Sequence, residues 1–375
     1  MTRLTFFPLG NADTTLIRLA DNRLVLLDYA DMRNPNDQFD SRCDLPVALR
    51  KEMSEAGQTD FAAVCFTHLD NDHICGASDF FWLRHSTAYQ GKGRPKIDEL
   101  WVPAGAITET GLVGNAATIR KEARHRLIEG TGIKVFSRPE LLKEFLASHG
   151  LTLEDRKHCI VDAGKLVPGF TKEGSARAEF FVHCPFAWRT DERGLEDRNK
   201  DSVVLHVTFI EGGVETKALL GSDVEYGTLC EIVKTSKKHG NEHRLEWDVL
   251  KLFHHCSYKS IGPEIGEDET ESVDETRWLF EEQSRDGCII VSPSWEIPQK
   301  GTAEDDDIQP PHRQAANHYK RVVADRGGEF KVTMETPDRI RPKPFRIDIT
   351  AFGAAISYIS SSSTGAATST PVRGG

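Results

Sequence analysis

Residues 67–73 read Thr-His-Leu-Asp-Asn-Asp-His, so four side chains that commonly bind metal ions lie within one short segment. They are His68, Asp70, Asp72 and His73. Imidazole and carboxylate groups are ligands of zinc and of harder divalent ions such as manganese. A loop can bring them together because it is not bound to helical or strand periodicity. The segment predicts a site for Zn or Mn, with one or two ions; a charged turn is the alternative interpretation.

This segment directly follows an apolar run, 61–66, that is typical of a buried strand. Upstream, the runs 4–9, 15–17 and 24–28 predict further strands, and 46–57 has the spacing of an amphipathic helix. The order strand, helix, strand indicates helices packed on a sheet, and such sheets place their chemistry in loops at strand ends. The second half is rich in predicted strands: 179–183, 202–210, 216–220, 249–253 and 288–291.

Between these regions the pattern is weaker. Residues 100–103 predict a short strand and 115–129 an amphipathic helix. A further helix is expected over 138–149, because Ser137 is a typical cap at its start and Gly150 follows its last turn.

The chain has 375 residues, of which 38% are hydrophobic and 28% charged, enough for one large decorated domain or for two domains. Its 47 Lys and Arg against 58 Asp and Glu leave a net charge of −11, so its average surface repels phosphate and membrane surfaces. Eight scattered cysteines without a CxxC pair indicate reduced thiols rather than disulfides. With neither a signal peptide nor a bilayer-spanning stretch, we predict a cytoplasmic protein without a membrane partner.

The HxDxDH string resembles the signature of the metallo-β-lactamase fold hydrolases, which usually reads HxHxDH. The form with Asp at the third position is similar to the hydrolase domain of the ComEC competence proteins, which take up DNA. Further segments resemble that family's conserved blocks in the same order. They are 7–15 (the opening "VGQGDS" loop), 25–28 ("LIDGG"), 219–225 ("LLTGD"), 250–257 ("LKVPHHGS") and 289–292 (the next strand).

The resemblance implies an α/β (α+β) fold, a four-layer αβ/βα metallo-β-lactamase sandwich with inserted loops and helices. We expect one hydrolase domain over 1–358, with an insertion at about 108–178. Residues 359–375 are rich in Ser, Thr and Gly and predict a disordered tail.

The resemblance also implies the metal ligands. In this set Asp223 would bridge two ions, and Asp72 and Asp223 would lie nearest the activated water. His255 competes with its neighbour for the last position and is otherwise a supporting donor. The expected set is His68, Asp70, Asp72, His73, Asp223 and His254.

Departures from the family pattern concern mainly the first ion. Asn199 stands where most relatives supply a third histidine, which predicts a weak first site. His183 is a candidate to compensate for the missing histidine, and the alternative interpretation is a strand histidine satisfied by the core. Lys259 and His312 follow positions that lie near the cleft in ComEC-like proteins, so each is a candidate substrate contact or an ordinary surface residue. Cys256 replaces the glycine of "HHGS".

The predicted function is a metal-dependent hydrolase, a phosphodiesterase or nuclease that acts through a metal-activated water. A phosphate ester, a cyclic nucleotide or a short nucleic acid fits the net charge better than long duplex DNA, because only 234–244 is densely cationic. Two alternatives remain open at this stage. One is a carboxylic ester, lactone or thioester hydrolase of the same fold. The other is a non-catalytic, metal-stabilised subunit that binds a protein partner through its inserts or tail.

Overall fold

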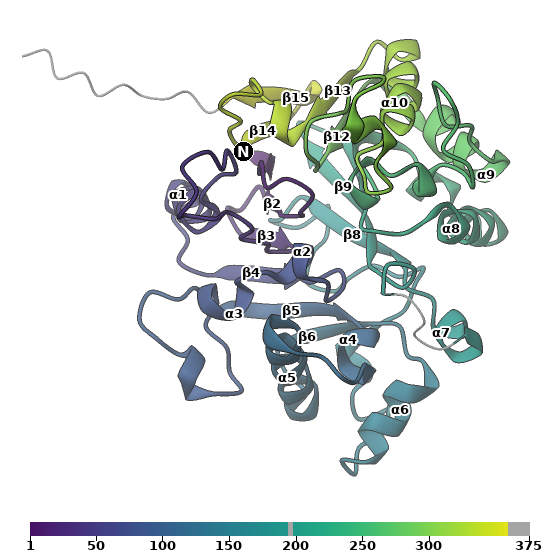
Figure 1. The fold of residues 1–375 in the computed structure, drawn as a ribbon. Helices are drawn as coiled ribbons and strands as arrows, with labels where there is room; N and C mark the ends of the chain where they lie inside the picture. Colours follow the sequence, from purple (N-terminus) through teal and green to yellow (C-terminus); the bar gives the residue numbers. More distant parts are fainter. Residues whose placement is uncertain (194–197, 359–375) are drawn as a thin grey trace, which may run out of the picture.

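The computed structural model describes residues 1–193 and 198–358, which form two β-sheets with helices on their outer faces (Figure 1). The first sheet has nine strands in the order β15, β14, β1, β2, β3, β4, β5, β6, β7. Their bounds are β1 Thr2–Phe6, β2 Thr15–Arg18, β3 Leu24–Leu27, β4 Phe61–Cys65, β5 Ile97–Pro103, β6 Ile133–Phe136, β7 Ile160–Val161, β14 Phe345–Thr350 and β15 Gly353–Tyr358.

The second sheet has six strands in the order β13, β12, β11, β10, β9, β8. Their bounds are β8 Ala178–Cys184, β9 Val204–Glu211, β10 Val214–Leu220, β11 Trp247–Lys251, β12 Ser284–Ser292 and β13 Glu329–Val332. The α-helices among the described residues are α1 Leu45–Ala56, α2 Asn71–Ile74, α3 Ala77–Phe80, α4 Gly105–Thr108, α5 Gly114–Glu129, α6 Glu140–Ala147, α7 Ala187–Arg193, α8 Tyr226–Lys238, α9 Asp274–Arg277 and α10 Arg313–Asp325.

In each sheet the strands toward one end run parallel, and the others are antiparallel. β3 pairs with β4 in parallel, and so do β4 with β5 and β5 with β6. In the second sheet β10, β11, β12 and β13 are parallel neighbours, whereas β8, β9 and β10 are antiparallel. The carboxyl ends of parallel strands meet at one edge of a sheet, so the loops after β3 and β4, and those after β10 and β11, are brought together in pairs.

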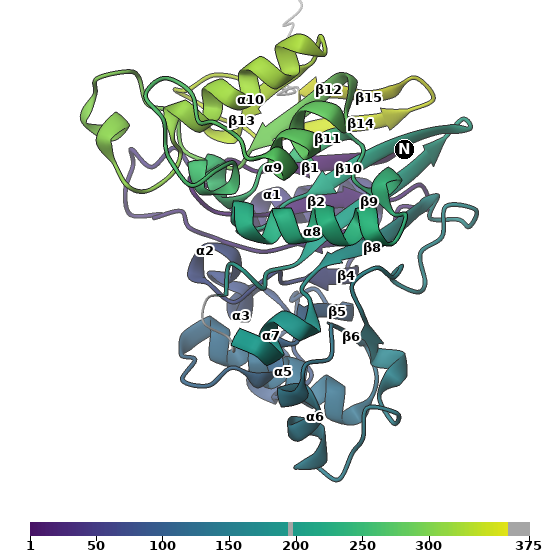
Figure 2. The same cartoon turned by 90° about the vertical axis from the view of Figure 1, so that its right-hand side faces the viewer.

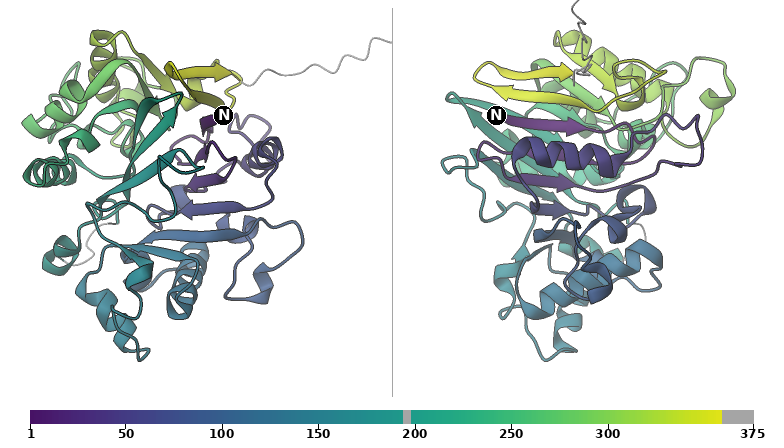
Figure 3. Two further views of the ribbon diagram at one scale, coloured as in Figure 1. Left: turned by 180° about the vertical axis from the view of Figure 1, so that it is seen from behind. Right: turned by 90° about the vertical axis from the view of Figure 1, so that its left-hand side faces the viewer.

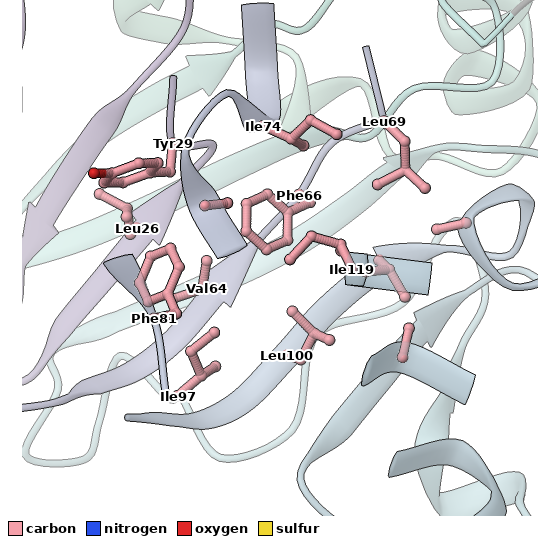
Figure 4. Close-up of a cluster of buried hydrophobic side chains, with 14 of the residues drawn as sticks. Leu26, Tyr29, Val64, Phe66, Leu69, Ile74, Phe81, Ile97, Leu100 and Ile119 are labelled. Carbon is pink, nitrogen blue, oxygen red and sulfur yellow. The ribbon is translucent and has the colours of Figure 1, made fainter. Parts of the chain in front are cut away.

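Three separate hydrophobic cores define the layers. One lies between the first sheet and its outer helices and contains Leu49 of α1, Val64 of β4 and Ile119 of α5 (Figure 4). The second lies between the two sheets and joins Phe6 and Phe345 of the first sheet to Phe180, Leu205 and Val249 of the second. The third joins the second sheet to α8 and α10, as Leu250, Leu229 and Tyr319 illustrate.

Three cores between successive layers give four layers: helices, sheet, sheet, helices. Figure 2 shows α8 and α10 on the outer face of the second sheet, and the right-hand view of Figure 3 shows α1, in purple, across the first sheet. The four-layer αβ/βα sandwich expected from the sequence is therefore confirmed.

Most predicted elements are confirmed, and one helix differs in length. The helix expected over 138–149 is α6, Glu140–Ala147, and Pro139 precedes it instead of the Ser137 cap. Ser137 has a left-handed φ of 71°, and its N–H donates to the Val161 carbonyl, so its backbone is committed to the edge of the sheet.

The region predicted as an insertion, about 108–178, supplies α5, β6, α6 and β7, and the last strands of the first sheet come from it. The predicted tail, 359–375, lies outside the described residues, and the domain boundary at 358 stays a prediction. Among the described residues, no helix has both the length and the apolar character that crossing a membrane requires.

Candidate metal centre

Three of the predicted ligands, Asp72, His73 and Asp223, lie close together where the two sheets meet. Thr67 follows β4 of the first sheet, and its carbonyl accepts a hydrogen bond of 3.0 Å from the backbone N–H of Val203, which precedes β9 of the second sheet. The Ser222 hydroxyl, after β10, donates to the Thr67 hydroxyl oxygen at 2.8 Å. These contacts hold the HxDxDH loop against the loop that carries Asp223.

The centre of the site is a cluster of carboxylate and imidazole groups. Ligand atoms of Asp13, His73, Asp223 and His255 all lie within 4.8 Å of one another, and all four residues are buried. The Oδ2 atom of Asp72 lies 3.3 Å from the Nε2 atom of His255. We refer to Asp72, His73, Asp223 and His255 as the ligand cluster, which Asp13 adjoins.

His73 is oriented by a carboxylate from the neighbouring strand. Asp28, which follows β3, accepts a hydrogen bond of 2.8 Å from the Nδ1 atom of His73. Its two carboxylate oxygens also accept from the backbone N–H and the hydroxyl of Thr67, each at 2.7 Å. Because Nδ1 donates to Asp28, the lone pair of Nε2 points into the cluster, 3.3 Å from Asp223 Oδ1.

His255 is oriented in the same manner by a backbone carbonyl. Its Nδ1 atom donates to the Pro293 carbonyl at 2.8 Å, which leaves Nε2 facing Asp72 and Asp223. The backbone around it is unusual, since His254, His255 and Cys256 all have left-handed φ values, of 46°, 51° and 68°. Non-glycine residues rarely adopt this conformation, and it is often found at functional sites.

Asp223 reaches the cluster where the chain after β10 passes close to the end of β11. A Cβ atom on Gly221 would stand 2.7 Å from the Lys251 carbonyl oxygen and 2.7 Å from the Phe253 ring. Glycine is therefore required at this point so that the chain can pass to Asp223. The carboxylate then lies between His73 and His255, at 3.3 and 3.6 Å.

Asp13 stands behind the cluster and is bound to a buried lysine. The Nζ atom of Lys251, at the end of β11, lies 2.7 Å from Asp13 Oδ2, and both side chains are 1% exposed. The backbone N–H of Asp13 donates to the Asp72 carbonyl at 2.9 Å. Since Lys251 compensates its charge, we assign Asp13 to the support of the cluster.

His68 and Asp70 lie beside the cluster rather than inside it. The Nε2 atom of His68 is 3.7 Å from Asp70 Oδ2 and 3.9 Å from Asp223 Oδ2. Its ring centroid is 4.0 Å from that of His73. Asp70 is a third exposed and forms an ion pair with Arg198.

The pKa values of the clustered imidazoles and carboxylates indicate that the site favours a cation. Burial lowers the pKa of His73, but the carboxylates of Asp223 and Asp28 outweigh it and hold this pKa well above its ordinary value. Burial and Asp223 oppose each other at His255 in the same way, and the carboxylate raises its pKa to about 10. Burial raises the pKa of Asp223 and of Asp72, but the neighbouring imidazoles outweigh it and lower both values. Imidazolium protons thus occupy positions from which a divalent ion would displace them.

The donor atoms fit a divalent metal ion. Buried Nε2 atoms of His68, His73 and His255, and Oδ1 of Asp223, have no hydrogen-bond partner within the described part of the chain. Buried polar atoms without partners are rare, and those of His73, His255 and Asp223 lie within 4.8 Å of one another. Two or three imidazoles with carboxylates form a mixed N and O donor set that suits zinc or manganese. His73, Asp223, His255 and Asp72 are the residues that would hold such an ion.

His254 and His255, the two candidates for the last ligand position, point in different directions. His254 is not among the residues whose ligand atoms converge, and its ring centroid is 6.3 Å from that of His255. Its buried Nδ1 atom has no hydrogen-bond partner among the described residues, and burial lowers its pKa. The structure places His255 where His254 was expected, and the ligand role of either residue stays a prediction.

Other predicted residues lie outside the ligand cluster. His183, on β8, donates from Nε2 to the Arg244 carbonyl at 2.8 Å and packs on Phe181, as expected of a core histidine. His312 is buried, and its Nδ1 atom accepts a weak hydrogen bond, of 3.4 Å, from the backbone N–H of Tyr258.

Asn199 and Lys259 also stand apart from the converging atoms. The carbonyl of Asn199 accepts from the Ser202 hydroxyl in the turn before β9. Lys259 is half-exposed, and its Nζ atom lies 4.0 Å from Glu225.

Three residues of the site were not assigned a role from the sequence: Asp13, Asp28 and Arg198. The first two stand inside segments that resemble the family's opening blocks, so their positions in those blocks were the available signal. Arg198 had none, because nothing in the sequence relates it to Asp70.

The fold and the site define an αβ/βα sandwich protein with a buried Asp and His cluster suited to a metal ion. No family model matches the sequence, and no curated protein matches it significantly. Solved structures show distant similarity. Unliganded yeast PDE1 has a TM-score of 0.42 at 10% identity, covering 88% of this chain and 97% of its own.

Two further solved structures show similarly distant matches. A diphosphatase from the PhnP family has a TM-score of 0.30 at 11% identity, covering 75% of this chain and 73% of its own. The metallo-β-lactamase GOB-18 from Elizabethkingia meningoseptica has a TM-score of 0.31 at 11% identity, covering 86% and 89%. At this level the assignment of the fold rests on the observed sheet order and layers.

Proposed function

We propose that this chain is a metal-dependent hydrolase of phosphate esters, acting as a phosphodiesterase or nuclease on small or short substrates. The observation that carries the proposal is the convergence of buried, unpartnered ligand atoms from His73, Asp223 and His255. A purely structural role for these groups would leave several desolvated polar atoms uncompensated.

The chain's own residues prepare the site for chemistry. Asp28 and the Pro293 carbonyl hold the Nδ1 protons of His73 and His255, so that both Nε2 atoms face Asp223. A divalent ion bound there would supply Lewis-acid activation of water and of a phosphoryl oxygen.

The phosphate-ester assignment is supported by two features. HxDxDH, with Asp70 at the third position, resembles the ComEC-like branch, which is associated with DNA. In addition, Arg198 lies beside the site on a side chain that is 36% exposed. The net charge of −11 favours a short or small substrate, because long duplex DNA needs many cationic contacts in register.

The test is a substrate panel on the full chain, stripped with a chelator and reloaded with Zn or Mn. Bis(p-nitrophenyl) phosphate, a cyclic nucleotide and a short single-stranded oligonucleotide should be hydrolysed. A p-nitrophenyl ester, a lactone and a thioester should be hydrolysed more slowly. Faster turnover of the carboxylic esters would overturn the phosphate assignment and leave a hydrolase of another bond.

A matched pair of variants separates catalysis by the site from contamination. Asp223→Asn should lower kcat/KM roughly 100-fold or more, because it removes a charged ligand without changing the shape of the side chain. Asp286→Asn, at a carboxylate that is 92% exposed, is the control and should retain wild-type activity. Equal turnover by both variants would contradict the proposal.

A further inference from the structure

The side chain of Arg198 reaches the part of the site where a first metal ion was expected. Its Nη1 atom forms an ion pair with Oδ1 of Asp70, which is the first aspartate of the HxDxDH string. Arg198 belongs to the turn before β9, immediately before Asn199, where most relatives of the resembled family carry a histidine ligand. A guanidinium group is therefore carried by the residue next to the position at which most relatives of the resembled family have a metal-binding imidazole.

A second carboxylate holds the guanidinium in place. Nε of Arg198 donates to Glu109 Oε1 at 2.7 Å, and Nη2 lies 2.5 Å from the same atom. Glu109 is mostly buried, at the end of α4. Arg198, Glu109 and His68 line one small cavity beside the cluster. With anchors on two sides, the guanidinium is fixed next to Asp70 rather than free to swing into solvent.

The remaining donors are too few for a first ion. His68 and Asp70 belong to no group of three or more converging ligand residues within the described part of the chain. Of the ligands expected for a first ion, Asp70 is engaged by Arg198, and His68 and a share of Asp223 remain, whereas zinc sites use three or four protein ligands. A cation bound there would also be repelled by the adjacent guanidinium.

We infer that Arg198 takes the place of the first metal ion, so that this chain binds a single divalent ion at His73, Asp223, His255 and Asp72. This inference rests on the proposed metal-binding function and specifies the stoichiometry of that site. The positive charge that a second ion would supply is then a permanent part of the polypeptide.

The test is metal stoichiometry, measured by native mass spectrometry and elemental analysis after reloading with zinc or manganese and removal of excess ion. Wild type should hold one ion per chain. Arg198→Ala frees Asp70 and should hold two, and Arg198→Lys, which restores a cation beside Asp70, should return to one. Arg341→Ala, at an exposed arginine, is the control and should match wild type.

Each possible metal count either supports or overturns the inference about Arg198. Two ions of comparable affinity in wild type, or one ion in Arg198→Ala, would overturn the inference and leave the proposed hydrolase function intact. No bound ion in wild type would overturn both. A thermal melt of each variant with and without metal verifies that Arg198→Ala is folded, since loss of fold would lower the count to zero rather than raise it.

Discussion

At the scale of single residues, the site depends on which of two adjacent histidines faces the cluster. Their side chains diverge because the backbone is left-handed at both residues and at Cys256. Nε2 of His255 lies 3.3 Å from Asp72 and 3.6 Å from Asp223, whereas no ligand atom of His254 joins the converging group. Replacing each of the two histidines in turn therefore tests which one binds the metal ion.

We expect His255→Ala to lower metal affinity by roughly 100-fold or more, because it removes one of about four ligands. His254→Ala is the matched control and should change affinity by less than about 10-fold. Isothermal titration of the stripped proteins with Zn measures both. The reverse ranking would show that the originally expected ligand, His254, is the true one.

Asp28 is expected to act through the ring that it orients. Asp28→Asn retains the shape of the side chain but weakens its acceptor role toward His73 Nδ1 and the two bonds from Thr67. Loss of such an outer partner usually lowers metal affinity about 10- to 100-fold. Competition with a chromophoric chelator measures the change, and an unaltered affinity would show that Thr67 and packing suffice to orient His73.

At the scale of secondary structure elements, two buried histidines connect the strands β8 and β9 to the segment before β11. His183 donates to the Arg244 carbonyl at 2.8 Å, and His206 donates to the Glu246 carbonyl at 3.1 Å. Burial lowers the pKa of His183 to about 4 and that of His206 well below its ordinary value. Both side chains are therefore neutral in the folded protein, and a proton on either one favours unfolding.

The lowered pKa values determine whether the free energy of unfolding rises or falls with pH. A histidine in the unfolded chain has a pKa of about 6.5, so below this pH the unfolded state binds more protons than the folded state. Stability contributed by neutral His183 is present above pH 6.5 and is lost as the pH falls toward 4. Between pH 7 and pH 5 this loss amounts to about 2 kcal/mol.

His183→Gln should therefore flatten the pH dependence of the free energy of unfolding by about that amount. Urea denaturation of wild type and variant, both metal-free, measures the difference at pH 7 and pH 5. Metal-free protein is needed so that release of an ion at low pH does not add to the slope. Parallel curves for the two proteins would show that folding does not lower the pKa of His183.

At the scale of the whole molecule, the two sheets are joined at the site by a buried ion pair. Asp13 comes from the loop after β1 in the first sheet, and Lys251 ends β11 in the second. Both charges are removed from water, so each depends on the other. The pair therefore links the stability of the sandwich to the position of the ligand cluster.

We expect Lys251→Met to lower the free energy of unfolding by about 3 to 5 kcal/mol, because Asp13 is left as a buried, unpaired charge. The double variant Asp13→Leu with Lys251→Met removes both charges and should regain much of this loss. Chemical denaturation of the metal-free proteins tests the pair. If the double variant is less stable than Lys251→Met, the lysine acts through packing rather than charge.

Much of the fold was predictable because its causes are local. The strand β4 is a continuous apolar run, and β10 and β11 carry shorter apolar segments, at 218–220 and 249–250. The ligand types in 67–73 were readable from the residues themselves, whereas Asp223 was expected from the resemblance to a family block. The α6 start was not predictable, because Ser137 is committed to Val161 across the sheet edge.

Residue types and their order along the chain already specified an Asp and His site at strand ends in a layered α/β protein, since hydrophobic periodicity and ligand chemistry are local properties. Pairings between distant segments required the folded chain. The choice of His255 depends on backbone angles, the Arg198 contact with Asp70 spans 128 residues, and Lys251 meets Asp13 across two sheets. Such contacts depend on how the layers pack. No periodicity or spacing in the sequence predicts which of these distant residues will meet.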